Sequence, residues 1–416
     1  MKRTISCFTI TGIPAIKEQI LYWINQFSIC SFLDNHQYSA PYHHVECLAA
    51  VGAIRVFEGP NTLQAIDAFY TTDADWLFGH LAYDQQSNPI GFSPSTFFQP
   101  ETVLRLSNTT LWIETIHASA ENIFEQIIAQ PMPSNEQALP IVMQPKIDKA
   151  AYLATVHQLK QHIQRGDCYE INFCQEFFAE NSPINPVQCY LGLTRISPTP
   201  FACYYKQQNA HLLCASPERY LQRQGMQLIS QPIKGTNKRN TANSLLDDEL
   251  KEALKQSTKD QSENVMVVDL VRNDLSKICK EGTVRVAELF GIYSFPQVHQ
   301  MISTVTGELK PNSLFTEIIE ASFPMGSMTG APKKRVMELI EQYEMNPRGI
   351  YSGAVGYIDP EQNFDFNVVI RSLMYNADNK YLSYWVGSGI TFYSNPEDEY
   401  EECLLKASAM NTILNQ

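Results

Sequence analysis

The stretch HLLCASPERYLQRQGMQLISQPIKGT, residues 211–236, is typical of two β-strands joined by a turn at 224–225. In such a hairpin, residues whose numbers sum to about 449 face each other, so we expect Glu218 opposite Gln231. Lys234 follows three residues further along, about 10 Å away at the rise of a strand. The sequence therefore predicts an antiparallel strand pair with a carboxylate and an ammonium group at one end.

Lys234 itself has two interpretations. The unperturbed pKa of a lysine is about 10.4, so at neutral pH the side chain is an ammonium ion and no nucleophile. Burial or a neighbouring cation would be needed to turn it into a nucleophile or a base. The alternative is an ordinary surface pair with Glu218, which would stabilise the fold by less than about 1 kcal/mol.

Strands and helices alternate along the rest of the chain without the regular strand–helix–strand rhythm of a parallel sheet. This pattern predicts an α+β fold with large, mixed, mostly antiparallel sheets. Residues 1–130 are expected to form an amino-terminal α+β region, and 131–145, rich in Pro, Gln and Ser, to form a linker. Residues 146–416 would form the main region, and the two regions together one compact unit.

Composition excludes several classes of partner. The 416 residues carry a formal net charge of −13, which argues against a nucleic-acid-binding or anionic-membrane surface. Ten cysteines are scattered singly, so neither a disulfide framework nor a zinc finger is expected. No signal peptide or membrane-spanning stretch is recognisable, and we expect a cytoplasmic protein.

Two acidic stretches are candidates for a metal site. Residues 259–275 are apolar nearly all round, which predicts a buried helix, and Glu263 lies near its start. The second helix, within 394–410, has one face that holds Glu399, Glu402 and Lys406. Acidic residues in a first turn can simply complement the helix dipole, which is the alternative. A few carboxylates with water as the remaining ligands suit Mg²⁺.

Three further stretches could bind an anion. Residues 323–341 read as a glycine-rich loop that enters a helix, although they do not match the P-loop pattern. Residues 383–391 read as a strand that runs into a Gly-Ser-Gly loop with free backbone amides. Arg371 is expected to be buried within the strand pattern of 366–375, where it needs a carboxylate partner. Together these features describe a small, multiply carboxylated ligand.

The motifs resemble those of the chorismate-utilising enzymes, and they occur in that family's order. The similarity is dense from about 145 to 410 and rests on ASPERY, QPIKGT, SENVMVVDLVRNDL, GSMTGAPKKRVMELI, GIYSGAVGYI, FNVVIRSL and GSGITFYSNPEDEYEECLLKA. The resemblance implies a central β-sandwich with helices outside, and a catalytic region within 146–416. It also implies chorismate as the substrate and Mg²⁺ as the cofactor.

Within this family, PIKGT is typical of the aminating branch, the aminodeoxychorismate synthases, whereas similar anthranilate synthases have alanine in place of Lys234. The resemblance implies that the Lys234 amine attacks C2 of chorismate while the C4 hydroxyl leaves, with Glu218 as general acid. Ammonia then adds at C4 and expels the lysine, which gives 4-amino-4-deoxychorismate for p-aminobenzoate and folate synthesis. The alternatives are anthranilate synthase activity, with anthranilate and pyruvate as products, and a homologue that binds its ligand without catalysis.

The resemblance also implies a set of ligand-binding residues. Mg²⁺ would be held by Glu263 and Glu402, with Glu399 as a further or water-mediated ligand. The substrate would be held by Arg371, Tyr351, Thr329, Gly330, Gly387, Ser388, Gly389 and Lys406.

Three positions depart from relatives or separate the branches. Relatives that use water have an activating lysine where this chain has Glu170, so a hydroxylating reaction is not expected. Some relatives have a histidine where this chain has Gln300, next to His299, and we assign neither a catalytic role. Relatives that bind tryptophan have LLES or LLDS, whereas FLDN at 32–35 ends in Asn35.

The nitrogen source is expected to be another protein. No cysteine of the chain has the Gly-x-Cys-x-Gly context of a class I glutamine amidotransferase. A separate glutaminase subunit would therefore supply the ammonia, and another enzyme would release p-aminobenzoate.

Overall fold

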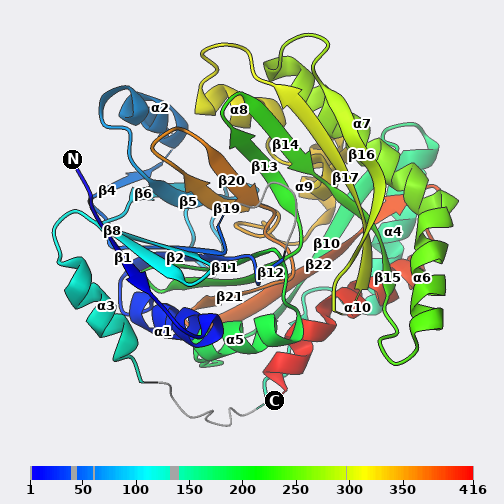
Figure 1. The fold of residues 1–416 in the computed structure, drawn as a ribbon. Helices are drawn as coiled ribbons and strands as arrows, with labels where there is room; N and C mark the ends of the chain where they lie inside the picture. The colour runs from blue at the N-terminus through cyan, green and yellow to red at the C-terminus, as the bar shows by residue number, and fades with distance from the viewer. Residues whose placement is uncertain (1, 39–44, 60, 132–139, 297, 416) are drawn as a thin grey trace.

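The computed structural model describes residues 2–38, 45–59, 61–131, 140–296 and 298–415. Its strands form two large sheets, and every strand pairing recorded in them is antiparallel. Figure 1 shows the two sheets facing each other, with helices on the outside. The predicted α+β class and the sandwich of antiparallel sheets are confirmed.

The larger sheet has 12 strands. In spatial order they are β1 (Thr4–Thr9), β8 (Thr110–Thr115), β7 (Thr102–Ser107), β3 (Cys47–Val51), β2 (Ile29–Asp34), β11 (Phe201–Gln207), β12 (Ala210–Ser216), β21 (Ser372–Asn376), β22 (Tyr381–Thr391), β10 (Glu170–Ala179) and β18 (Gly330–Ala331), with β9 (Gln144–Pro145) also paired to β10.

The smaller sheet has 10 strands. In spatial order they are β15 (Ile233–Lys238), β17 (Val298–Glu308), β14 (Gln227–Gln231), β13 (Arg219–Gln224), β20 (Phe364–Asn367), β19 (Ala354–Ile358), β5 (Leu77–Leu81), β6 (Ser95–Gln99) and β4 (Arg55–Glu58), with β16 (Arg285–Ser294) also paired to β17.

The α-helices of the described residues are α1 (Ile13–Ile24), α2 (Thr62–Thr72), α3 (Ala120–Ile128), α4 (Lys149–Gln164), α5 (Pro186–Ile196), α6 (Ser244–Gln256), α7 (Thr258–Ile278), α8 (Phe315–Ser322), α9 (Lys333–Tyr343) and α10 (Pro396–Leu414). Among the residues that the structure describes, no helix is both long and apolar enough to cross a membrane.

Both faces of the larger sheet are buried. Along β12, Leu212 and Cys214 point into the core shared with the smaller sheet, whereas Leu213 and Ala215 point into a second core. This second core packs against α1, α5 and α10, which lie below the sheet in Figure 1. Two-sided burial explains why β12 is apolar at every position from 212 to 215 instead of alternating.

Strands from both sequence regions share the two sheets. β2 pairs with β11 in the larger sheet, and β5 pairs with β19 in the smaller one. Residues 132–139, which make up most of the predicted linker, lie outside the described residues.

The structure corrects three local expectations. The predicted first strand of 211–236 is two strands, since β12 lies in the larger sheet and β13 in the smaller. The turn is at 225–226, and Arg219 rather than Glu218 lies opposite Gln231. The helix expected to be buried, α7, is buried along one side only, with Val265 exposed on the other.

Candidate active site

Glu218 lies where the chain crosses from the larger sheet to the smaller one. Its backbone amide donates a hydrogen bond to Ser216 Oγ (3.2 Å), and its carbonyl accepts one from the Val368 amide (3.0 Å). The side chain is buried. Burial raises the pKa of the carboxyl to about 7, although Ser327 and nearby cations act in the opposite direction. Glu218 is thus a carboxylic acid that still carries its proton for part of the time at neutral pH.

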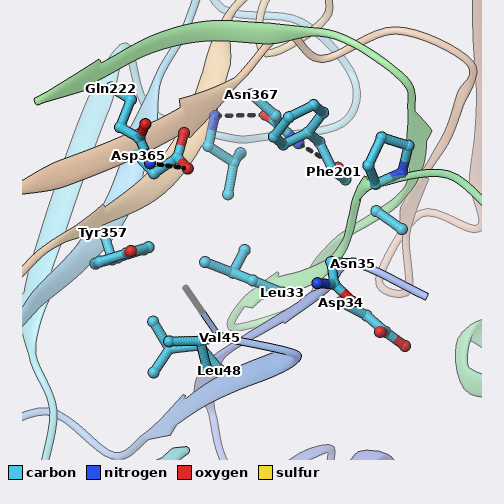
Figure 2. Close-up of a pocket in the computed structure, with 13 residues that line it drawn as sticks. Leu33, Asp34, Asn35, Val45, Leu48, Phe201, Gln222, Tyr357, Asp365 and Asn367 are labelled. Atoms are coloured by element: carbon cyan, nitrogen blue, oxygen red, sulfur yellow. Dashed lines mark hydrogen bonds between the residues drawn. The ribbon is translucent and has the colours of Figure 1, made fainter. Parts of the chain in front are cut away.

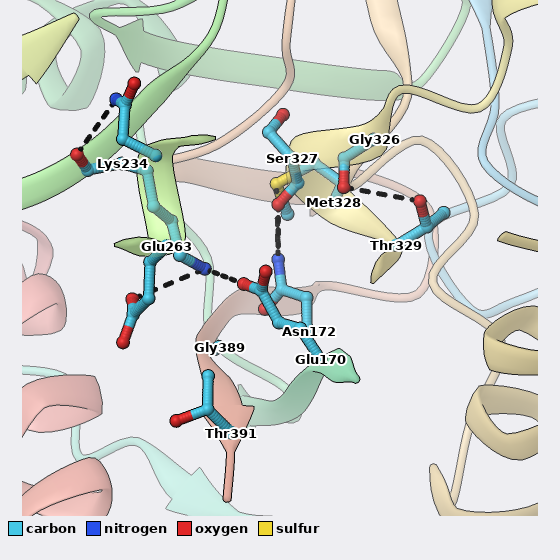
Figure 3. A network of polar contacts seen from close by, with 12 residues as sticks. Glu170, Asn172, Lys234, Glu263, Gly326, Ser327, Met328, Thr329, Gly389 and Thr391 are labelled. Atoms are coloured by element: carbon cyan, nitrogen blue, oxygen red, sulfur yellow. Dashed lines mark hydrogen bonds and ion pairs between the residues drawn. The ribbon is translucent and has the colours of Figure 1, made fainter. Parts of the chain in front are cut away.

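Lys234 reaches the same region from β15. The pairing of β15 with β17 is irregular between Ile233 and Thr236, at the position of this lysine. Figure 3 shows the Lys234 ammonium between two carboxylates: it forms an ion pair with Glu170 Oε1 and lies 4.0 Å from Glu263 Oε2. Burial alone would lower the pKa of Lys234, but these carboxylates outweigh it and the pKa is raised. In the absence of ligands the side chain is therefore an ammonium ion.

Glu170 is the functional residue that the sequence reasoning missed. In the sequence it is notable only as a position without lysine, yet it is 2% exposed and binds Lys234 directly. Its second oxygen, Oε2, is buried without a hydrogen-bond partner among the described residues. One signal was available, because a glutamate opens the stretch EINF at 170–173, in which Ile171 and Phe173 are apolar.

The Gly-Ser-Gly segment is not the loop that we expected. Gly387, Ser388 and Gly389 lie within the continuous strand β22 and pair with β10. Lack of space explains why position 389 is a glycine: a Cβ atom on Gly389 would lie 2.1 Å from Lys234 Nζ and 2.7 Å from Glu170 Oε1. On its other edge, the recorded pairing of β22 with β21 ends at Tyr384. On that edge, the backbone amides of β22 beyond Tyr384 are therefore available to bind a carboxylate.

Arg371 is in a different setting from the one expected. It lies in the turn before β21, with a left-handed φ of 51°, and not inside a strand. Burial lowers its pKa to about 10, while Glu218 acts in the opposite direction. Within the described residues its guanidinium group has no recorded ion pair, so it remains available for an anionic ligand. Nearby, the buried Tyr351 ring stacks on Trp385 with 5.7 Å between centroids.

The glycine-rich loop is held against β10 by hydrogen bonds. Asn172 donates from its amide to Thr329 O (2.8 Å) and from Nδ2 to Ser327 O (3.0 Å). The Thr329 hydroxyl donates to Met325 O (3.1 Å), so this side chain is already used inside the loop. At Gly330 a Cβ atom would lie 2.1 Å from Glu170 O, which explains the glycine. The loop contributes shape and backbone groups to the site.

A buried arginine, also missed from the sequence, holds this loop in place. Arg348 Nη1 donates to Met328 O (2.8 Å) and Nη2 donates to Asn172 O (2.8 Å). The same guanidinium forms two hydrogen bonds with Glu344, at 2.8 and 2.6 Å. Arg348 therefore joins the glycine-rich loop, β10 and the end of α9.

The three carboxylates expected to hold a metal lie on two helices, α7 and α10, and face the same region. In the structure, lysines neutralise them. Lys259 Nζ lies 4.0 Å from Glu263 Oε1 and 3.7 Å from Glu399 Oε1. The third carboxylate, Glu402, forms an ion pair of 2.7 Å with Lys406, which also donates to Gly387 O (2.8 Å).

These carboxylates fit a hard cation. Glu263 Oε1 is buried without a hydrogen-bond partner among the described residues, and burial raises the pKa of its carboxyl to about 7. An oxygen donor set of this kind is what Mg²⁺ prefers. However, the described part of the chain holds no group of three acidic, histidine or cysteine residues close enough to enclose a metal ion. The carboxylates would have to move closer together around one.

A cavity lies away from this centre. Figure 2 shows it between the two sheets, with Asp34, Asn35, Tyr357, Asp365 and Asn367 among the residues that line it. The FLDN motif, where relatives bind tryptophan, thus faces a cavity that Lys234 does not reach. We assign the candidate active site to the region of Glu218 and Lys234 and not to this cavity, because the acid and the lysine that could carry out chemistry lie there.

The His299 ring contacts two side chains, Ser294 and Asp247, that hold it in the fold. The ring accepts or donates a hydrogen bond with Ser294 Oγ (2.8 Å) and lies 3.2 Å from Asp247 Oδ1 of α6. These contacts attach α6 to β17. The neighbouring Gln300 is buried, and its Oε1 has no hydrogen-bond partner in the described residues.

Comparisons with known proteins agree with the motif reading. The family model of the chorismate binding enzyme matches residues 32–412. A Synechocystis protein named anthranilate synthase component I-like is 32% identical over 402 residues, which cover 95% of this chain and 79% of that protein. Escherichia coli aminodeoxychorismate synthase component 1 is 35% identical over 288 residues, or 68% of this chain and 61% of that one.

Other relatives are longer than this chain. Arabidopsis aminodeoxychorismate synthase is 38% identical over 66% of this chain, but the match covers only 31% of that protein. Among solved structures, MenF, the isochorismate synthase of Escherichia coli, has a TM-score of 0.79 at 19% identity, over 100% of this chain and 95% of that one. Anthranilate synthase component I of Streptococcus pneumoniae has a TM-score of 0.76 at 22% identity, over 90% and 95%. These two structures support the fold alone.

Proposed function

The chain belongs to the family of chorismate-binding enzymes, and on that premise we propose that it aminates chorismate at C4 to form 4-amino-4-deoxychorismate. One observation carries this proposal: a largely buried lysine, Lys234, with a side chain that is 13% exposed, lies in the same site as a buried carboxylic acid, Glu218, whose pKa is raised to about 7. The reaction needs a nucleophile and an acid together. The curated relatives named aminodeoxychorismate synthase support the same branch.

The first chemical step forms a covalent adduct. The Lys234 ammonium releases one proton to solvent, and its neutral amine attacks C2 of chorismate. The ring double bonds shift and the C4–O bond breaks, while Glu218 donates its proton so that the hydroxyl leaves as water. This divides one difficult displacement into two easier ones. The enolpyruvyl group takes no part.

The second step releases the enzyme. Ammonia attacks C4, the double bonds shift back and the C2–N bond to Lys234 breaks. A proton lost from the new C4 ammonium balances the one that the departing lysine gains. Overall, chorismate and ammonia give 4-amino-4-deoxychorismate and water, with no oxidant or reductant.

The remaining residues bind and orient the substrate. We assign the enolpyruvyl carboxylate to Arg371, Tyr351 and the amides of 387–389, since the arginine has no recorded ion pair of its own. Glu263 and Glu402, with Glu399, would hold Mg²⁺. When bound, the ion supplies positive charge for the ring carboxylate of the substrate. Lys406 would face the substrate after release from Glu402.

Ammonia would come from a separate glutaminase subunit. This fits the name component 1 carried by the Escherichia coli relative. The competing activity, formation of anthranilate and pyruvate, is favoured by the name of the Synechocystis relative but requires no lysine nucleophile. Product analysis with chorismate and an ammonium salt separates the two: retention of the enolpyruvyl group supports our proposal, and free pyruvate contradicts it.

A further inference from the structure

Two residues define the position of the Lys234 amine. Glu170 Oε1 forms an ion pair with Nζ, and Gly389 leaves the space that Nζ occupies, since a Cβ atom there would lie 2.1 Å from it. Figure 3 shows Glu170 and Gly389 on neighbouring strands below the lysine. The two strands are β10 and β22, in which Glu170 pairs with Thr391.

The carboxylate at position 170 is less well satisfied than another carboxylate of the same strand. A second buried glutamate of the same strand, Glu176, has both oxygens bonded, one to Asn346 Nδ2 (2.6 Å) and one to the Tyr381 hydroxyl (3.0 Å). Glu170 has one oxygen on Lys234 and one without a partner among the described residues. A buried carboxylate that is only half satisfied costs free energy, and the recorded hydrogen-bond partner of the Glu170 side chain among the described residues is Lys234, which points to a role at the lysine.

The end of the Lys234 side chain needs a partner that fixes its position. Its side chain has four rotatable bonds, whereas attack on C2 requires the nitrogen at one place and in one orientation. The backbone is held by Asn264 Nδ2, which donates to Lys234 O (3.3 Å), but this leaves the end of the side chain free. Glu170 provides a directed hydrogen-bond acceptor at that end, and the missing side chain of Gly389 leaves room for the amine beside it.

We propose that Glu170 is a positioning residue for the nucleophile Lys234, and that Gly389 keeps open the space in which Glu170 holds the amine. This inference rests on the proposed function and deepens it. It assigns a role in the first chemical step to two residues of neighbouring strands, β10 and β22. Glu170 is not expected to be needed for chorismate affinity, whereas the Gly389 amide belongs to the group assigned to the substrate carboxylate.

The test measures adduct formation before any ammonia is added. The full chain and its variants are mixed with chorismate and Mg²⁺, quenched at increasing times, and analysed by mass spectrometry for Lys234 carrying chorismate less one water. Chorismate affinity is measured in parallel by equilibrium dialysis. The variants are Glu170→Ala, Glu170→Gln and Gly389→Ala, with Glu176→Ala as the matched control of the same strand.

Positioning predicts a specific pattern. At saturating chorismate, Glu170→Ala and Gly389→Ala should slow adduct formation by about 100-fold, the effect of displacing a reacting group by about 1 Å. The chorismate affinity of Glu170→Ala should stay within about threefold of the parent. Glu170→Gln keeps an acceptor oxygen and should stay within about tenfold of the parent. Glu176→Ala should form the adduct at the parental rate if it folds.

Each of the other possible results contradicts either the inference or the proposed function. An unchanged rate in Glu170→Ala or Gly389→Ala would refute the inference, and so would a Glu170→Gln rate as low as that of Glu170→Ala. Gly389→Ala changes no charge and lies in a strand backbone that alanine can adopt, so it decides the question even if Glu170→Ala does not fold. No adduct in the parent would instead refute the proposed function, and the inference with it.

Discussion

Replacing Glu218 by glutamine is expected to slow the reaction and, above neutral pH, to stabilise the fold. Glutamine has nearly the same shape but cannot donate the proton that the leaving hydroxyl needs. Loss of a general acid typically costs about 10²- to 10⁴-fold in rate. The effect on stability follows from the pKa of the buried carboxyl, which burial raises from 4.5 to about 7.

The sign of the stability effect is fixed by the direction of this shift. Below pH 4.5 Glu218 is protonated in both the folded and the unfolded chain. Between pH 4.5 and 7 the unfolded chain loses this proton and the folded chain keeps it, so the stability of the parent falls as pH rises. At 1.36 kcal/mol per pKa unit, the loss amounts to about 3 kcal/mol above pH 7. The glutamine variant has no such loss.

The assay is the thermal midpoint of Glu218→Gln and parent from pH 5 to pH 8. An unfolding entropy of roughly 2.1 cal/mol/K per residue gives this 416-residue chain about 3 °C of relative stabilisation over that range. The exposed residue Glu281 supplies the control, since Glu281→Gln should show no pH-dependent difference. A gap between Glu218→Gln and parent that is flat, or that shrinks as pH rises, would refute the assignment of Glu218 as a buried acid.

Three further predictions concern side chains around this acid. Lys234→Ala should abolish the chorismate adduct in mass spectra, and an unchanged rate with ammonia would rule out the lysine as nucleophile. Lys259→Met should tighten Mg²⁺ binding about tenfold by calorimetry, because the ammonium no longer competes for the carboxylates, and weaker binding would contradict this. Lys149→Met, which removes a lysine paired with other α10 carboxylates, is its control and should change nothing. Arg348→Met should lower the free energy of unfolding by about 3–5 kcal/mol in urea because Glu344 loses its buried partner, and a loss under about 1 kcal/mol would refute that role.

Local signals in the sequence are sufficient to recognise several elements. Asp148 caps α4 and Asn395 caps α10, where Pro396 follows at the first turn, as their residue types suggest. The turn near Gly225 and the antiparallel pairing of β13 with β14 were also recognisable. Such features depend on a few neighbouring residues, so one sequence is sufficient to recognise them.

Features that depend on the two sheets together could not be predicted. The run 211–224 looks like one strand, because the break at Pro217 matters only once the chain crosses between sheets. Gly389 looked like a loop residue, although its small size makes room for Lys234, which is far away in sequence. The contact of Lys234 with Glu170 spans 64 positions, and no local pattern specifies such a contact.

The most direct test of the account is product analysis of the purified chain. Chorismate, Mg²⁺ and an ammonium salt are incubated with the protein at mildly alkaline pH, and the products are identified by chromatography and mass spectrometry. We expect 4-amino-4-deoxychorismate with its enolpyruvyl group retained, and no pyruvate. Anthranilate together with free pyruvate would contradict the account and would mean that Lys234 is not the nucleophile.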